Sequence, residues 1–161
     1  MRIYESQVDA RGLRVAVVVA RFNHLLCARL LEGCIAELER RGARRDDIDV
    51  AWIPGAFEIP LAARAFATSG RYDAIVTLGV VVRGGTPHFE YVCRGVTDGV
   101  QAVMRDTSLP VAFGVLTVDD IEQAWERAGG SEGNKGAEAA AAAIEMARLL
   151  SRAGKPPRDT A

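Results

Sequence analysis

The sequence has few lysines and cysteines, no long apolar run and no excess charge of either sign. It contains 20 basic and 21 acidic residues and a formal net charge of -1, so there is no general positive charge to hold a nucleic-acid backbone. The longest apolar stretches, 15–20 and the Thr77-interrupted 74–82, are far shorter than the roughly 18 residues that span a bilayer. These absences exclude a dedicated nucleic-acid binder and a membrane-spanning protein.

Cysteine is also scarce. The three cysteines are odd in number and lack the spacing of a metal site, and the N-terminus lacks the apolar segment of a secretory signal. We therefore expect a soluble protein of the reducing cytoplasm. The 161 residues correspond to one domain with a sizeable core, so we expect a single domain over 1–161 with a disordered tail from about residue 154.

The apolar pattern alternates between strand-like and helix-like segments, with Gly or Pro at most changeovers. This pattern is typical of repeated βα units and predicts a parallel sheet. The first strand is a continuous β-branched run, as expected for a strand buried on both faces. The predicted strands are 13–20, 48–52, 74–82 and 111–116. The predicted helices are 24–41, 58–68, 88–106, 119–128 and 137–152, with a flexible loop at 129–136.

Helix-capping signals precede two of these helices. Asn23 can cap the first helix, and Asp119 with Glu122 has the spacing of a capping box. In the first helix, Cys27 and Cys34 fall on the apolar face, so we expect both thiols in the core.

The loops that follow the strands form the candidate site, because ligands of an open parallel sheet bind beyond the carboxyl ends of its strands. The first three loops contain an aromatic ring, a carboxylate and an imidazole: Phe22, Glu58 and His88. In the third loop, Gly84 and Gly85 let the backbone approach a ligand, and the helix N-terminus that follows can hold an anion. His88 stands where an imidazole could transfer protons near neutral pH.

Each of these residues also has a purely structural interpretation. The glycines could form a tight turn, His88 could cap or pack, and Phe22 could belong to the core. Glu58 and Arg127 could complement helix dipoles, and Lys135 could be a solvated charge. From the residues alone, the sequence predicts a small-molecule site with an anion pocket.

A resemblance extends this prediction. Residues 79–93, GVVVRGGTPHFEYVC, resemble the signature of the 6,7-dimethyl-8-ribityllumazine synthase family, which catalyses the penultimate step of riboflavin biosynthesis. Segments 21–23 (RFN), 54–60 (PGAFEIP) and 113–136 resemble it in the same order and spacing. The similarity covers about residues 1–150. It implies a flavodoxin-like α/β fold, a three-layer αβα sandwich around a four-stranded parallel sheet.

The resemblance implies a reaction and residue roles. The family condenses 5-amino-6-(D-ribitylamino)uracil with 3,4-dihydroxy-2-butanone 4-phosphate to the lumazine, phosphate and water, without a metal or organic cofactor. Phe22 would stack on the pyrimidine and His88 would transfer protons. The phosphate would be bound by Gly85 and Thr86 together with Arg127, and a neighbouring subunit would supply Phe113 and Lys135. The ribityl chain and the uracil edge would be held by Ala56, Phe57 and Glu58, and by the backbone of Val80, Val81 and Val82.

Ala20, His24 and the segment 130–132 depart from the usual family pattern, which bears on substrate affinity more than on reaction type. Two other functions remain open at this point. A flavodoxin-like binding or regulatory domain would share the βα pattern, and a shell-forming homologue could have lost activity.

The last helix points to an assembly. Between 137 and 150 its only charged residues are Glu138, Glu145 and Arg148, so it is apolar around most of its circumference and should be buried on more than one side. The resemblance implies pentamers with active sites between subunits, in which residues 3–6 add a strand to the neighbour's sheet. The short 129–136 connection resembles that of members that form a hollow icosahedral 60-mer. The resemblance also suggests riboflavin synthase as a partner.

Overall fold

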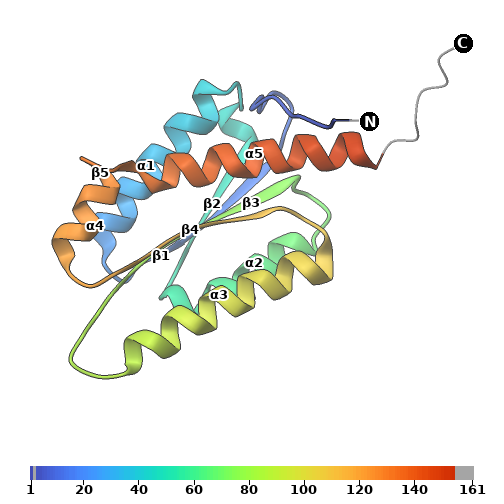
Figure 1. The fold of residues 1–161 in the computed structure, drawn as a ribbon. Helices are drawn as coiled ribbons and strands as arrows, with labels where there is room; N and C mark the ends of the chain where they lie inside the picture. Colours follow the sequence, from blue (N-terminus) through green and yellow to red (C-terminus); the bar gives the residue numbers. More distant parts are fainter. Residues whose placement is uncertain (2, 155–161) are drawn as a thin grey trace, which may run out of the picture.

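The computed structural model describes residues 1 and 3–154, which form a sheet between two layers of helices (Figure 1). All four strands of the sheet are parallel, in the order β2-β1-β3-β4. This confirms the predicted three-layer fold. The strands are β1 (Val15–Ala20), β2 (Ile48–Ile53), β3 (Ala74–Val82) and β4 (Val111–Val118). The predicted disordered tail begins at about residue 154, and its residues 155–161 lie outside the described residues.

Helices cover both faces of the sheet (Figure 1). The buried residues form two hydrophobic core clusters. On one face lie α1 (His24–Arg40) and α5 (Lys135–Ala153), and on the other lie α2 (Ile59–Ala67) and α3 (His88–Thr107). Every residue of β1 is buried, as its continuous apolar run predicts. Cys27 and Cys34 are buried in the core as predicted, and burial raises the pKa of these thiols to about 11 and about 12.

Both predicted helix caps are wrong, for identifiable reasons. Asn23 has a left-handed backbone with φ 59°, unlike the extended backbone of most capping residues, and its side chain makes no capping bond. Its Nδ2 donates instead to the carbonyl oxygen of Val80 at 2.8 Å. Asp120 caps α4 (Ile121–Arg127) by accepting from the backbone N–H of Gln123 at 2.9 Å. Asp119 is turned toward the Arg83 guanidinium.

The predicted flexible loop at 129–136 is also wrong. Residues 128–134 form an antiparallel hairpin of β5 (Ala128–Gly130) and β6 (Gly133–Asn134), and α5 begins two residues earlier than expected. Asn134 orders the segment from both sides. Its Oδ1 accepts from the backbone N–H groups of Gly136 and Ala137, and its Nδ2 donates to the carbonyl oxygen of Arg29 at 2.8 Å.

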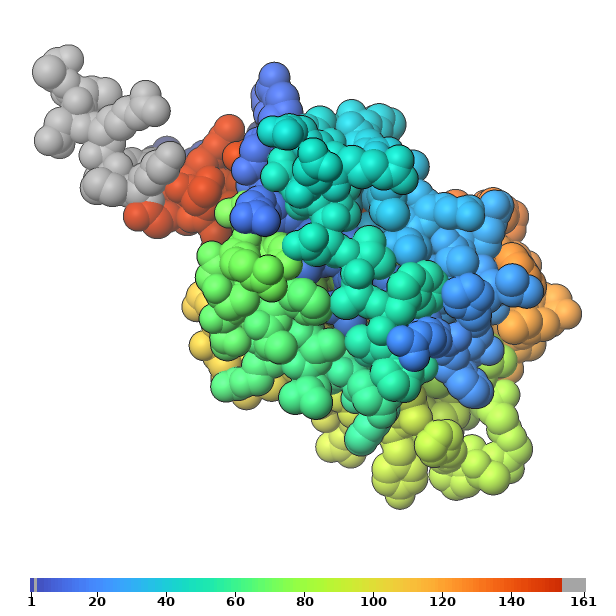
Figure 2. Space-filling model, turned by 180° about the vertical axis from the view of Figure 1, so that it is seen from behind, coloured from blue at the N-terminus to red at the C-terminus, as the bar shows by residue number. Residues whose placement is uncertain are grey.

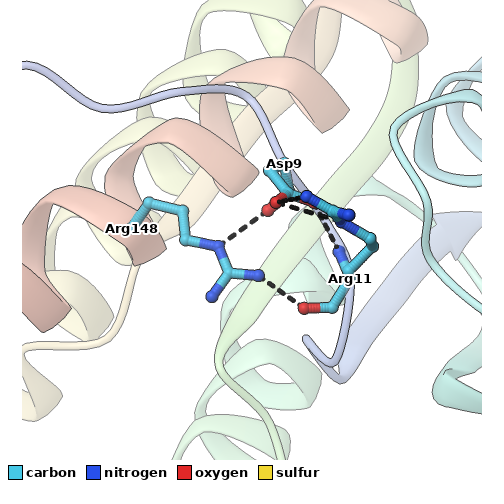
Figure 3. A network of polar contacts seen from close by, with 3 residues as sticks. All are labelled: Asp9, Arg11 and Arg148. Carbon is cyan, nitrogen blue, oxygen red and sulfur yellow. Dashed lines mark hydrogen bonds and ion pairs between the residues drawn. The ribbon is translucent and has the colours of Figure 1, made fainter.

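The segment before β1 is tied to α5 without forming a strand in residues 3–14. Figure 3 shows the Arg148 guanidinium between two backbone carbonyls of this segment, donating to Asp9 at 2.7 Å and to Arg11 at 2.5 Å. Arg152 donates to the carbonyl oxygen of Glu5 at 2.5 Å. The Asp9 carboxylate accepts from the Arg11 side chain and backbone, which lowers the pKa of Asp9. The segment therefore follows α5 toward its start.

Within the described chain, α5 is buried along one side only. Ile144 and the buried alanines pack on the sheet and α1, while Met146 and Leu150 remain 43% and 42% exposed; these alanines are Ala139, Ala140, Ala143 and Ala147. Burial on a second side therefore stays a prediction that requires a partner. None of the described helices is long and apolar enough to cross a membrane.

Candidate active site

A cavity of about 760 Å³ opens at the carboxyl ends of β1, β2 and β3, within the size range of small-molecule sites. We call it the strand-end cavity. The chain brings together here all of the residues predicted to contact the pyrimidine, from the β1–α1 loop, the β2–α2 connection and β3. Its lining includes Phe22, Ala56, Phe57, Glu58, Val80, Val81, Val82, Gly84, Thr86 and His88.

Two exposed aromatic rings stand at this cavity. The ring of Phe22 belongs to a residue that is 73% exposed. The Phe22 backbone is held by two hydrogen bonds: its N–H donates to the Pro54 carbonyl oxygen, and the Phe22 carbonyl oxygen accepts from the Cys27 thiol. Phe57 is 61% exposed and lies against α3 at Gly95, where an added Cβ would come within 2.6 Å of the ring. These rings are not core residues, so an interpretation of Phe22 as core is excluded.

The cavity lies over the switch point of the sheet. The chain passes from β1 outward to β2 and then returns to β3 on the other side of β1, and ligands of doubly wound folds bind at such reversals. The bond from Asn23 Nδ2 to the Val80 carbonyl oxygen crosses from the end of β1 to β3 at this point.

The connection from β3 to α3 forms another side of the cavity and projects from the body of the molecule (Figures 1 and 2). Thr86 and His88 line the cavity, and Gly85 lies between the lining residues Gly84 and Thr86. His88 is the first residue of α3 and is exposed. The start of this 20-residue helix lies at the cavity, which its residues His88, Phe89, Tyr91 and Val92 line, and helix N-termini favour anions.

A second cavity, of about 500 Å³, lies at the free edge of β4, between this strand and α5. We call it the edge cavity. It brings together Phe113, Arg127 and Lys135. Arg127, the last residue of α4, donates to the Gln123 carbonyl oxygen at 3.0 Å, and Lys135 pairs with Glu138 at 2.8 Å. About a third of each cationic side chain is exposed, at 35% and 34%.

The two cavities share no lining residue. Within one chain, Arg127 therefore lies with Phe113 and Lys135 rather than with Gly85 and Thr86, its predicted partners at the phosphate. The strand-end cavity has the aromatic rings, the carboxylate and the imidazole. The edge cavity has the cationic side chains. The lining of the strand-end cavity thus includes no Lys or Arg side chain, and that of the edge cavity includes no imidazole.

A family model described as 6,7-dimethyl-8-ribityllumazine synthase matches residues 12–151 of the 161-residue chain. The chain belongs to this family. The match spans every strand and both cavities and confirms the predicted family, fold and reaction class. Lumazine synthases are transferases that act on small molecules and form oligomers. Among residues 1 and 3–154, no group of three or more His, Cys, Asp or Glu side chains could hold a metal ion.

Several cavity residues were not singled out from the sequence. In the strand-end cavity they are Phe89, Tyr91 and Val92 on the first turns of α3, and Tyr91 is 73% exposed. In the edge cavity the main one is Glu138. Lys135 and Glu138 are neighbours because they are three residues apart on α5, but the predicted helix began only at residue 137, so the sequence did not indicate this pair. Nothing in the sequence separates Tyr91 from an ordinary surface tyrosine.

Proposed function

We propose that the chain condenses 5-amino-6-(D-ribitylamino)uracil with 3,4-dihydroxy-2-butanone 4-phosphate in an active site built from the strand-end cavity of one subunit and the edge cavity of the next. The observation that carries this proposal is the division of the predicted site residues between two open cavities. One cavity has groups suited to the pyrimidine and the other has cations suited to a phosphate. Each therefore supplies what the other lacks.

The strand-end cavity suits the pyrimidine. The exposed ring of Phe22 offers a face on which a flat heterocycle can stack. Glu58 is exposed at the cavity and can accept hydrogen bonds from ribityl hydroxyls, beside the Ala56 and Phe57 backbone. The ends of Val80–Val82 present backbone groups that can read the uracil edge.

The phosphate of the second substrate would lie at the start of α3, between Gly85–Thr86 of one subunit and Arg127 of its neighbour. The helix N-terminus supplies N–H donors, and a guanidinium fits phosphate oxygens in a bidentate manner. The neighbour's Phe113 and Lys135 would close the site from the same side, since they share a cavity with Arg127.

The reaction suits these groups. The amine of the pyrimidine is the nucleophile that attacks the ketone, and imine formation, loss of phosphate and ring closure follow. Because the substrate supplies the nucleophile, the protein mainly holds two substrates together and moves protons during these steps. His88 lines the cavity and is exposed, so it can exchange protons with both substrate and solvent. The buried thiols of Cys27 and Cys34 have raised pKa values and are unsuited to act as nucleophiles.

The assembly that we propose is a pentamer, with twelve pentamers closing into a hollow icosahedral 60-mer. Ile3 and Tyr4 are 70% and 54% exposed, and β2 has a free edge where Val50 is 40% exposed, so a strand from residues 3–6 of a neighbour can pair there. The short β5–β6 hairpin supports the closed shell. Light scattering tests it, because a pentamer mass would refute the shell while keeping the shared site. Co-purification tests riboflavin synthase as a partner.

The decisive experiment mixes the purified protein with both substrates and follows the absorbance of the lumazine. Omission of either substrate is the control, and uncatalysed condensation is subtracted. Lumazine formation above that background supports the proposal. Binding of the pyrimidine without turnover would instead favour a binding domain, and assembly without binding or turnover would favour an inactive shell protein.

A further inference from the structure

Arg83 stands between the two loops that border the site and contacts both of them. Its Nε donates to Asp119 Oδ1 at 2.8 Å in the β4–α4 loop, and its Nη1 donates to Glu90 Oε1 at 2.5 Å in the first turn of α3. The guanidinium carbon lies 4.3 Å from the centre of the Phe89 ring, a cation–π distance. The backbone N–H of Arg83 also donates to the Val118 carbonyl oxygen at 2.9 Å.

The segment that Arg83 begins has little other support. Among the described residues, 84–86 make no hydrogen bond to another part of the chain, and an added Cβ at Gly84 or Gly85 would meet no atom within 4 Å. The segment projects from the body of the molecule (Figures 1 and 2). Its polar attachments are therefore those of Arg83 at one end and the first turn of α3 at the other.

The contacts of Arg83 argue against a role as a phosphate ligand. Its guanidinium engages two carboxylates and a ring, and Arg83 does not line the strand-end cavity. The backbone N–H of Glu90 and the Arg83 guanidinium lower the pKa of Glu90, so that carboxylate remains charged at neutral pH. The charge of Arg83 is thus balanced by two carboxylates, and neither of their residues lines the strand-end cavity.

We propose that Arg83 is a positioning residue of the active site, which clips the first turn of α3 to the β4–α4 loop and thereby sets the backbone of Gly85–Thr86 and the ring of His88. The proposal rests on the proposed function for what this loop binds. It adds a residue that touches no substrate. Asp119 and Glu90 are its anchors, because they lie on the two elements that the guanidinium joins.

Loss of the clip should act on one substrate more than on the other. Misplacement of a binding loop by about 1 Å can cost roughly 100-fold in rate. For Arg83→Ala we expect kcat/KM for the butanone phosphate to fall about tenfold or more, with a raised KM for this substrate and a lower kcat. The KM for the pyrimidine should stay within about twofold, because its predicted contacts lie mainly on the other loops.

The experiment compares four variants with the parent chain. Arg83→Ala removes the clip. Arg83→Lys keeps the charge but cannot reach both carboxylates with a planar fork, so it should restore only part of the activity. Asp119→Asn weakens one anchor while leaving Arg83 in place. Arg40→Ala is the matched control, because Arg40 is also a surface arginine held by a carboxylate, that of Glu37. Arg40 is the last residue of α1, about 24 Å along the helix from its start near the strand-end cavity.

Two readouts are taken. The first is KM and kcat for each substrate, and the second is hydrogen exchange of the backbone N–H groups that are hydrogen-bonded at the two ends of the segment, those of Arg83 and Glu90. We expect faster exchange and a raised butanone phosphate KM in Arg83→Ala, smaller changes of the same kind in Asp119→Asn, and neither in Arg40→Ala. Exchange rates equal to those of Arg40→Ala would overturn the clip. A fall in kcat with both KM values unchanged would overturn the positioning role, because a smaller fraction of folded protein lowers kcat without changing either KM.

If Arg83→Ala does not assemble, Asp119→Asn decides the proposal by the same criteria. A parent chain that forms no lumazine would refute the proposed function. The exchange comparison would then still decide whether Arg83 holds the loop, so the two failures are distinguishable.

Discussion

Two variants with impaired activity should restore each other's activity when they assemble together. His88→Ala damages the strand-end cavity and leaves the edge cavity intact, while Arg127→Ala does the reverse, since the two cavities share no residue. If each site combines the two cavities from adjacent subunits, a mixed ring contains some sites in which both halves are intact. Neither variant alone contains any.

The size of the recovery follows from the arrangement. In a random one-to-one mixture, a strand-end cavity has an intact His88 in about half of the cases and its neighbour has an intact Arg127 in about half, so about one quarter of the sites are complete. One general acid–base residue contributes ~10²- to 10⁴-fold, so this quarter stands far above the residual activity of His88→Ala. The recovered sites should show the parent KM for both substrates.

The assay co-expresses the two variants with different affinity tags and purifies the oligomers through both tags in turn. Mass spectrometry gives the ratio of the two chains, and lumazine absorbance gives the rate per site. A second preparation, of two separately purified variants mixed without reassembly, is the control. A mixed oligomer no more active than the average of its parents would refute the shared site, and so would an active monomer.

Four further outcomes are expected. His88→Ala should lower kcat ~10²- to 10⁴-fold yet leave measurable turnover, because positioning of the substrates persists, and parent-like turnover would remove its role. Arg127→Ala should raise the KM for the butanone phosphate much more than that for the pyrimidine, whereas equal effects would indicate a structural arginine. Glu58→Gln should modestly weaken a ribityl-bearing inhibitor, as measured by calorimetry, and an unchanged affinity contradicts the assignment. Gly136→Ala should destabilise the fold by about 1–3 kcal/mol in denaturant unfolding, because its Cβ would come within 2.0 Å of the Leu30 carbonyl oxygen, and an unchanged midpoint would show that α1 and α5 can separate freely.

The sheet was predictable because its signal is local. A strand buried on both faces must be apolar throughout, and β3 runs between Asp73 and Arg83, two charged residues that mark its limits. Its predicted bounds agree with the structure. The strand-end cavity was predictable for a related reason, since parallel strands bring their following loops to one edge and Phe22, Glu58 and His88 each follow a strand.

The errors lie where one side chain had several possible partners. Asp119 and Asp120 are adjacent and chemically alike, and the structure assigns the second to the cap because Arg83, distant in sequence, takes the first. In the same way, the Asn23 side chain donates to the Val80 carbonyl oxygen instead of capping α1. The separation of Arg127 from Gly85 and Thr86 depends on which elements border β4, and no pattern along the chain reports that.

The amide of Asn23 has a mechanical consequence. At the reversal of strand order the loops that follow the two adjacent strands diverge, which leaves a crevice beyond the strand ends. Here the ends of β1 and β3 are joined across that crevice by a side chain as well as by the backbone ladder. The Asn23 amide therefore ties the residue that follows Phe22 directly to the end of β3, so the position of the ring after one strand is coupled to the backbone at the end of the other.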